Sequence, residues 1–416
     1  MTAQRGKRSS GRSRLRLATA FAAGTMAVVA AGAVPAGAAS VPSSVTVSSF
    51  KVNFAEMSAL KPLVSSGKGL IGVILPDTTS STRYVDFDAP YFHQAFTKAG
   101  YAPSQYKIDN AQGVDATELS LAQADISLGA SVLVFDPLDS TVGAEVQSYA
   151  ASHGVKLISY DRATFVGTPT YYVSFNNVTV GKLIGGGFNS CVAAWKIKKP
   201  QVFELDGGED TDPNAVSFAQ GYNSVIWGTT QTPMTAGKTN SKGWVLVGDQ
   251  ITPGWVNATG ATIFQQQYTA HPNINATVEA NDGLANAVIG DLKADGVKPK
   301  TIPTTGQDAT LQGMENILDN YQCGSVYKPI YKETQAAVAL ATILRAGKTP
   351  PKALLNGTTS PPPGKPGTTQ PAVLLTPTWV QPSNMNKTVI SDKFISATTL
   401  CTAVGTSVCK AAGITP

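Results

Sequence analysis

Residues 157–177 read LISYDRATFVGTPTYYVSFNN, and the rest of the chain is organised around them. A short apolar run ends abruptly in Asp161 and Arg162, an acid beside a base. A loop with a glycine and a proline then leads into a second strand-like run over 171–175. In an open α/β sheet, the carboxyl ends of buried strands present side chains to a ligand. We therefore expect Asp161 and Arg162 to lie at the centre of a binding cleft.

The bulk composition describes a large, nearly neutral globular chain. Its 416 residues leave room for two or more domains, and 42% are hydrophobic. Six of the 32 basic residues lie in the first 16 positions, so 26 remain against 27 acidic residues. The body of the protein has no basic field for nucleic acid and no polybasic membrane patch.

The N-terminus has the pattern of an export signal. A basic segment ends at Arg16, an alanine-rich apolar run covers 17–34, and an A-x-A pattern follows at 36–38. We expect 1–39 to be a cleaved signal peptide. The alternative, a retained membrane anchor, is disfavoured by the small residues at its end and the Ser/Thr stretch after it. No later run approaches the ~20 apolar residues of a span. The predicted location is periplasmic or extracellular, at the cell surface.

The cysteines fit an oxidising compartment and argue against metal or redox chemistry. Cys401 and Cys409 lie close together in a small-residue tail, so we expect a local disulfide there. Cys191 and Cys323 could be free and buried, because spacing cannot decide their pairing. There is no C-x-x-C pair, and the three histidines are isolated. We therefore expect no cofactor and no metal.

Apolar strand-like runs alternate with helical patterns twice along the chain. This alternation predicts parallel sheets covered by helices on both faces, and its length predicts two similar lobes. The first series has strands at 69–75, 106–110, 132–135 and 155–160; the second has strands at 201–205, 245–249, 276–280, 301–305 and 322–327. A helix to 346 follows.

Three segments of the chain lie outside the two predicted lobes. Residues 40–68 form an N-terminal extension. Residues 350–371, which include NGTTSPPPGKPGTTQP, are too rich in proline for a helix or a central strand. We interpret them as a surface excursion, in preference to an inter-domain linker, because a strand pair at 372–375 and 389–394 is expected after them. Residues 401–416 form a tail.

Polar side chains follow nearly every predicted strand. One such aspartate alone is usually a helix N-cap. Eight endings of this kind would line a cleft between two facing lobes with donors and acceptors. With Tyr84 and Trp255 close by, this is the chemistry that a pyranose sugar requires, since its apolar face packs on a ring and its hydroxyls take paired hydrogen bonds. The endings are Asp77, Asp136, Asp161-Arg162, Asp210 with Asp212, Asp249, Asn281-Asp282, Gln307-Asp308 and Lys328.

An ordered set of motifs resembles the D-xylose-binding proteins, the substrate-binding subunits of bacterial pentose ABC importers. The resemblance covers roughly 69–394 and implies a type I periplasmic binding protein fold, with two Rossmann-like lobes and a three-crossover hinge. It implies a first lobe of 69–174 plus 329–349 and a second of 175–328 plus 372–400. The motifs are YDR at 160–162, YYVSFNN at 171–177 with Gly181, GDQ…GW at 248–255, ANDG at 280–283, GQDA at 306–309, VYKP at 326–329 and LLTP at 374–377.

The same resemblance implies a set of ligand-binding residues and no catalytic ones. Tyr84 stands where the family has tryptophan, Pro213 replaces an asparagine in a D-N-N-A run, and the loop 77–82 departs most from the family pattern. The implied partners are a monosaccharide and a membrane permease, with the protein a monomer. The implied ligand contacts are Arg83, Tyr84, Asp161, Arg162, Asn214, Trp255, Asn281, Asp282, Asp308 and Lys328.

Three other functions compete with this interpretation. Asp161, Asp212 and Asp308 could serve a glycoside-processing enzyme, but Arg162 and Lys328 would keep carboxylates ionised, which suits binding rather than acid catalysis. A transcription regulator of the same fold would begin with a DNA-binding motif instead of an export signal. A binding protein for another aldose or polyol (arabinose, ribose, glucose or galactose), serving a sensor or chemotaxis partner, shares every residue above. We expect an exported monosaccharide-binding protein, with D-xylose as the leading ligand.

Overall fold

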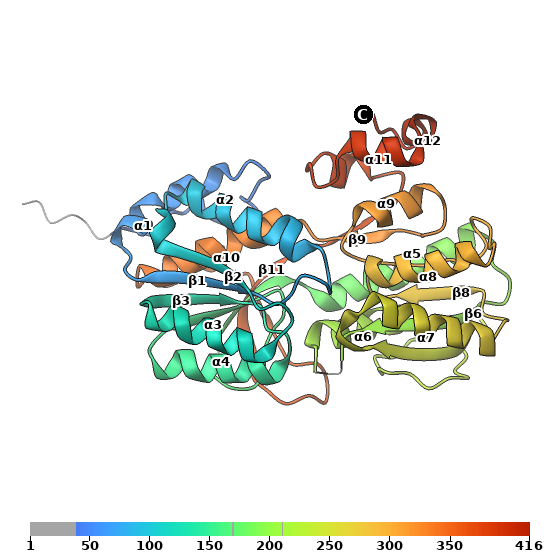
Figure 1. The fold of residues 1–416 in the computed structure, drawn as a ribbon, viewed down its shortest axis with the longest axis horizontal. Coiled ribbons are helices and arrows are strands. Elements are labelled where there is room, and N and C mark those ends of the chain that lie inside the picture. Colours follow the sequence, from blue (N-terminus) through green and yellow to red (C-terminus); the bar gives the residue numbers. More distant parts are fainter. Residues whose placement is uncertain (1–38, 169, 210) are drawn as a thin grey trace, which may run out of the picture. The chain divides into compact units, whose positions relative to one another are not determined.

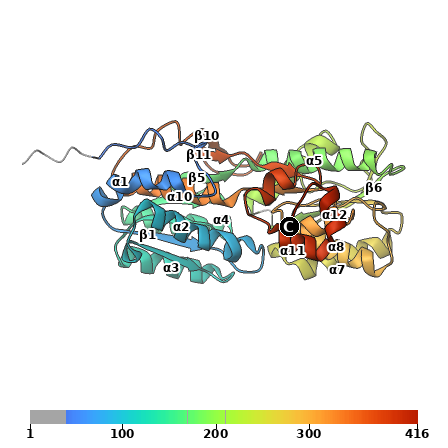
Figure 2. The ribbon, with the colours of Figure 1, turned by 90° about the horizontal axis from the view of Figure 1, so that it is seen from above.

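The structure is a computed structural model that describes residues 39–168, 170–209 and 211–416 (Figures 1 and 2). The expected signal peptide, except its last residue, and the strand-end residue Asp210 lie outside the described residues and remain predictions. Within the described part of the chain, no helix is long and apolar enough to cross a membrane.

The first lobe is built on a seven-stranded sheet with the order β10-β11-β5-β4-β3-β1-β2. All neighbouring strands are parallel except β10, which pairs antiparallel with β11 at one edge. The central strands are apolar on both faces, as a parallel sheet covered on both sides requires. The strands are β1 (Leu70–Leu75), β2 (Tyr106–Asn110), β3 (Ala130–Phe135), β4 (Lys156–Tyr160), β5 (Tyr171–Phe175), β10 (Gly357–Thr359) and β11 (Gln370–Leu375).

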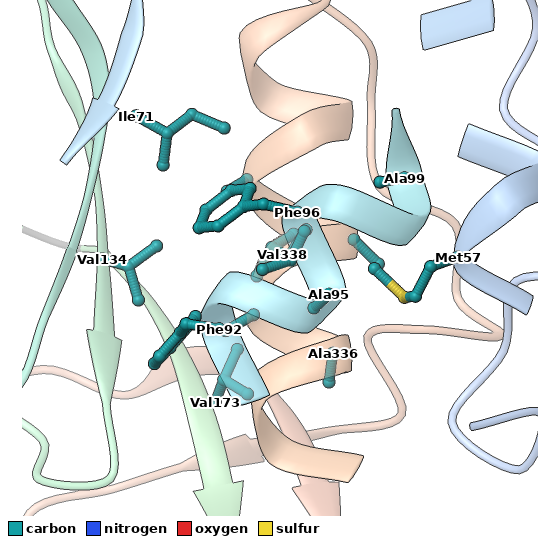
Figure 3. Close-up of a cluster of buried hydrophobic side chains, with 14 of the residues drawn as sticks. Met57, Ile71, Phe92, Ala95, Phe96, Ala99, Val134, Val173, Ala336 and Val338 are labelled. Carbon is teal, nitrogen blue, oxygen red and sulfur yellow. The ribbon is translucent and has the colours of Figure 1, made fainter. Parts of the chain in front are cut away.

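Helices cover both faces of this sheet (Figure 1). Figure 3 shows Phe92 and Phe96 of α2 beside Val338 of α10, facing the strand residues Ile71 and Val134. The N-terminal extension contributes to the same core. One face carries α1 (Lys61–Ser66), α2 (Ala89–Ala99) and α10 (Ile330–Arg345), and the other carries α3 (Asp115–Ser127) and α4 (Ser140–Ser152).

The second lobe has a three-stranded parallel sheet with the order β7-β6-β8. The expected strand at 301–305 does not form a ladder; that segment bonds beside β8 through Thr277 and Thr305. Helices α5 and α6 pack closely because Gly181 and Gly221 face each other without side chains. The elements are α5 (Asn177–Ala194), β6 (Gln201–Gly207), α6 (Pro213–Ile226), β7 (Val245–Thr252), α7 (Asn257–Ala270), β8 (Ala276–Glu279), α8 (Asp282–Ala294), α9 (Leu311–Leu318) and β9 (Ser325–Tyr327).

The C-terminal part corrects two sequence expectations. Residues 372–375 were assigned to the second lobe, but β11 pairs in parallel with β5 in the sheet of the first lobe, with Ala372 opposite Tyr172. Residues 389–394 were expected to be a strand, but helical turns occupy Asn386–Ile390. The chain returns to the second lobe through β12 (Thr378–Val380), which pairs with β9, and ends in α11 (Ala397–Val404) and α12 (Thr406–Ala411).

Two disulfides brace the second lobe and the tail. Cys401 and Cys409 are joined, as expected from their spacing. Cys191 and Cys323, whose pairing the sequence left open, are also joined, with their Cα atoms 5.7 Å apart across a sequence separation of 132. The sequence could not decide this pairing because it depends on α5 lying beside the segment that leads into β9, a contact with no local signature.

Candidate functional site

A cavity between the lobes brings together nine of the ten residues that the sequence nominated. The empty space among its side chains is about 310 Å³, counting the part open to solvent. The nine residues are Arg83, Tyr84, Asp161, Arg162, Asn214, Trp255, Asn281, Asp308 and Lys328.

Asp161 sits at the centre of the first-lobe wall, just beyond the end of β4. Its Oδ1 accepts a hydrogen bond from Arg83 Nη1 at 2.9 Å, and its Oδ2 accepts from the Tyr84 hydroxyl at 2.9 Å. Lys328 Nζ lies 3.7 Å from Oδ1. Burial by itself would raise its pKa, but the charges of Arg83, Lys328 and Arg162 hold the pKa of Asp161 well below its usual range. Asp161 is therefore a fixed anion in the cavity wall.

Arg83 mainly holds this wall in place. Its Nε and Nη2 donate to Asp88, its Nη2 also donates to Glu333 at 2.7 Å, and its Nη1 donates to Asp161. A guanidinium has five N–H donors, and most of them are engaged here. Arg83 thus contributes to the site chiefly by orienting Asp161.

Arg162, in contrast, keeps donor capacity for a ligand. Its guanidinium carbon lies 5.6 Å from the centre of the Tyr84 ring, and its Nε lies 3.5 Å from Asp212 Oδ2. Within the described residues, its buried Nη1 has no hydrogen-bond partner, although Asp136 Oδ1 is 3.7 Å away. A buried donor without a partner costs about 1–3 kcal/mol, so a ligand oxygen at this position would be stabilised.

The second-lobe wall combines an aromatic surface with two charged groups. The Trp255 indole donates from Nε1 to Asp212 Oδ2 at 2.9 Å and meets the Phe218 ring edge-on. Asp308 Oδ1 lies 3.7 Å from Lys328 Nζ and, in the described structure, accepts no hydrogen bond. This wall offers an apolar ring and a polar atom without a hydrogen-bond partner. Such a wall suits a molecule with an apolar face and hydroxyls at its rim.

The two walls meet through hydrogen bonds next to the point between β5 and α5 where the chain first passes from the first lobe to the second. The amide of Asn214, on α6, donates to the backbone oxygen of Asp161 at 3.0 Å. Tyr172 donates to the same oxygen, and Asn177 donates to Asn214 Oδ1. The backbone of Asp161 is in the left-handed region, with φ 54°. The stretch at 157–177 thus carries both a wall of the cavity and part of the joint between the lobes.

Asp282 does not line the cavity, in contrast to the prediction from the resemblance. It begins α8 and is fully buried, and its carboxylate accepts from the Thr310 backbone N–H and from Gln322 Nε2. Burial raises its pKa to about 7. A strand-end motif could not distinguish its side chain from that of Asn281, which does reach the cavity.

Five lining residues were not among the nominated contacts. Asp212 and Gln307 had been noted as strand endings, and Asp212 also in the enzyme alternative, but neither as a ligand contact. Ser80 and Ser81 lie in the loop that departs most from the family pattern, and Phe218 occupies an ordinary apolar position of a helix. Local sequence carries no signal for these three. The five are Ser80, Ser81, Asp212, Phe218 and Gln307.

Glu118 is a buried carboxyl group of the first lobe that interacts with the charge of Arg162, and it allows a test by pH. Glu118 is fully buried on α3, and both its oxygens accept from the Leu138 N–H. Burial raises its pKa to about 9, from 4.5 for a free glutamate. It therefore folds protonated at neutral pH, and its contribution to stability is lost as pH rises from 4.5 towards 9.

We predict that Glu118→Gln flattens this pH dependence. The quantity to compare is the free energy of unfolding of the variant minus that of the unchanged protein. This difference should grow by up to about 1.4 kcal/mol for each unit by which the pH rises. Urea unfolding at pH 5, 6, 7 and 8 measures it. Glu145→Gln, at an exposed glutamate of α4, is the control and should leave the slope unchanged. A constant difference for Glu118→Gln across this range would contradict the prediction.

Fold and site together define a protein with two α/β lobes and a polar cavity between them. A family described as periplasmic binding protein domain matches residues 71–349. The chain belongs to this family, which consists of solute-binding proteins.

Relatives with known names show which members of this family the chain is similar to. The chain is 32% identical over 290 residues to the D-xylose-binding periplasmic protein of Escherichia coli, covering 69% of this chain and 80% of that one. It is 33% identical, with the same coverage, to the protein of that name from Haemophilus influenzae. A multiple sugar-binding periplasmic receptor of Rhizobium radiobacter is 28% identical over 81% of this chain and 93% of that one.

Solved structures agree on the fold. A carbohydrate transporter solute-binding protein of Chloroflexus aurantiacus, in complex with D-glucose, matches with a TM-score of 0.66 and 25% identity over 80% of this chain and 98% of that one. An ABC transporter solute-binding protein of Clostridium phytofermentans matches with a TM-score of 0.68 and 24% identity, over 80% of this chain and 99% of that one.

Proposed function

We propose that this protein captures a neutral monosaccharide in the interlobe cavity and delivers it to the permease of an ABC importer, with D-xylose as the first candidate. One observation carries the proposal. The aromatic Trp255 lines the same cavity as Arg162 and Asp308, each of which has a buried polar atom (Nη1 and Oδ1) without a hydrogen-bond partner in the described structure. A pyranose supplies what each lacks: hydroxyls for the polar atoms and a C–H face for the ring.

The charge balance of the cavity supports a neutral ligand. The carboxylates of Asp161, Asp212 and Asp308 face the cations of Arg83, Arg162 and Lys328. Arg83 lies 2.9 Å from Asp161, and the other ion pairs between them are 3.5–3.7 Å long. A charged ligand would leave one side of this balance uncompensated in a buried site, which is costly. Sugar hydroxyls can donate to the carboxylates and accept from the cations without adding charge.

The relatives' names point in the same direction. Two relatives above 30% identity are D-xylose-binding periplasmic proteins, and others are multiple sugar-binding proteins. We extend to this chain the sugar class that they share and rank xylose first. We also propose export to the periplasm or the cell surface, a monomeric state and docking on a membrane permease.

Binding would favour closure because each lobe holds half of the site. Asp161 and Arg162 come from the first lobe, and Trp255 and Asp308 come from the second. A sugar touches both sets only when the lobes are together, so it stabilises the closed state. A sugar that lacks or inverts one hydroxyl leaves one of these groups unpaired, at a cost of about 1–3 kcal/mol.

Calorimetric titration of the purified exported protein tests this function. The sugars are xylose, arabinose, ribose, glucose and galactose, and we expect micromolar or tighter binding of at least one, with xylose tightest. Absence of heat with all five would overturn the sugar assignment. Tight binding of another aldose with weak binding of xylose would retain the class and overturn only the ranking.

A further inference from the structure

A second hollow, which we name the side cavity, adjoins the sugar cavity. Its empty space is about 1140 Å³, counting the part open to solvent, against about 310 Å³ for the sugar cavity. The two share four lining residues, which therefore form the boundary between them: Ser80, Ser81, Asn281 and Asp308. The side cavity extends outward from this boundary to the C-terminal segment before and in α11.

The lining of the side cavity suits a neutral polyhydroxyl group. Hydroxyl and amide side chains predominate, with Asn286, Thr310 and Gln312 among them, and Phe87 and Phe394 supply an aromatic surface. Among the described lining residues there is no lysine or arginine, while two carboxylates are present. A phosphate or a carboxylate group would find no counter-ion there, whereas a sugar finds both donors and a ring.

The boundary between the two cavities belongs to both lobes. Ser81, from the first lobe, donates to Asp308 Oδ2, from the second lobe, at 3.1 Å. Asp308 itself is held at φ 95° by a backbone hydrogen bond from its N–H to Val326, and its Oδ1 faces Lys328. One side chain therefore contacts both cavities. A sugar oxygen beside Asp308 would stand where one cavity passes into the other.

The outer wall of the side cavity is held in place by aromatic stacking and by the C-terminal core. The rings of Phe87 and Phe394 are stacked with centroids 4.0 Å apart. Phe394 belongs to a compact C-terminal core that includes the Cys401–Cys409 disulfide. The wall is thus a packed surface against which a group attached to the primary sugar could rest.

We propose that the side cavity is a subsite for a second, neutral sugar unit, so that the protein binds glycosides or disaccharides as well as the monosaccharide. This rests on the proposed function, since the first unit occupies the sugar cavity. The glycosidic oxygen would lie beside Asp308, and the second unit would contact the hydroxyl and amide groups and the Phe87–Phe394 pair.

Titrations with xylose, glucose, xylobiose, cellobiose and glucose 6-phosphate test the subsite. We expect at least one disaccharide to bind as tightly as its monosaccharide, or more tightly, and the phosphate to give no gain over glucose. Thr399→Trp fills the side cavity from an exposed position of α11. It should weaken the disaccharide at least tenfold and the monosaccharide less than twofold. Thr398→Trp, at the exposed neighbour outside the lining, is the matched control and should change neither.

The outcomes separate the two proposals. Binding of a monosaccharide with every disaccharide weaker by a hundredfold or more would overturn the subsite and leave the proposed function intact. Equal loss of disaccharide affinity in both tryptophan variants would also overturn it. Absence of binding for every sugar, single or double, would overturn the proposed function itself.

Discussion

Replacing Asp161 by asparagine should weaken sugar binding by roughly 10–150-fold. The carboxylate is buried, is held ionised by Arg83, Lys328 and Arg162, and faces the cavity. A hydrogen bond to a charged group contributes about 1.5–3 kcal/mol, which corresponds to roughly 10–150-fold in affinity. Asparagine keeps the shape but removes the charge, and it also releases Arg83 and Lys328 from their common partner. Calorimetric titration with the best-bound sugar measures the loss.

Two comparisons make this result specific to the site. Asp161→Ala should also lower the free energy of unfolding by about 3–5 kcal/mol, because it leaves buried cations without their partner. Asp295→Asn, at an exposed aspartate after α8, should change neither affinity nor stability. Unchanged sugar affinity in a folded Asp161→Asn protein would show that the ligand site lies elsewhere.

Replacing Gly207 by alanine should weaken sugar binding by about tenfold or more, although Gly207 does not line the sugar cavity. A methyl group there would overlap the six-membered ring of Trp255. A rigid indole, hydrogen-bonded to Asp212 and packed on Phe218, cannot yield to it without leaving its place beside the sugar. Overpacking of this kind typically costs about 1–3 kcal/mol of stability. Affinity by titration and stability by urea unfolding check both effects.

A double-mutant cycle identifies the route of the effect. If Gly207→Ala acts by displacing the indole, Trp255→Ala and the double variant should bind sugar equally weakly. Gly186→Ala is the matched control, since a methyl group on that glycine of α5 meets no atom within 4 Å. It should leave affinity unchanged and raise stability by up to about 1 kcal/mol. A further loss of affinity on adding Gly207→Ala to Trp255→Ala would contradict this mechanism.

Much of the site was predictable because its chemistry follows the ends of strands. The parallel arrangement of β1, β3 and β4 in one sheet, and of β6 and β8 in the other, puts residues that lie far apart in sequence at neighbouring strand ends. Asp161, Arg162 and Asn281 therefore reach one cavity, as expected from the pattern alone. The resemblance added Arg83 and Asn214, which no periodicity distinguishes from other polar residues.

Other parts of the site could not be predicted from the sequence because they depend on non-local packing. Asn281 and Asp282 are adjacent, yet only Asn281 faces the cavity, because the first turn of α8 directs Asp282 towards Thr310 and Gln322. The partners of Arg83 are spread along the chain, so their competition for its donors has no local trace. The same holds for the side cavity, whose walls come from both lobes and the C-terminal segment.

The alternation of apolar and polar residues along the chain was enough to predict two α/β lobes with polar strand ends, because strand and helix periods are local properties of a sequence. Only the tertiary structure decided three other features. These are the strand that β11 pairs with, the disulfide partner of Cys191 and the burial of the Asp282 side chain. Each of them depends on which distant segment comes to lie alongside, and the energies that choose among such contacts are summed over the whole core.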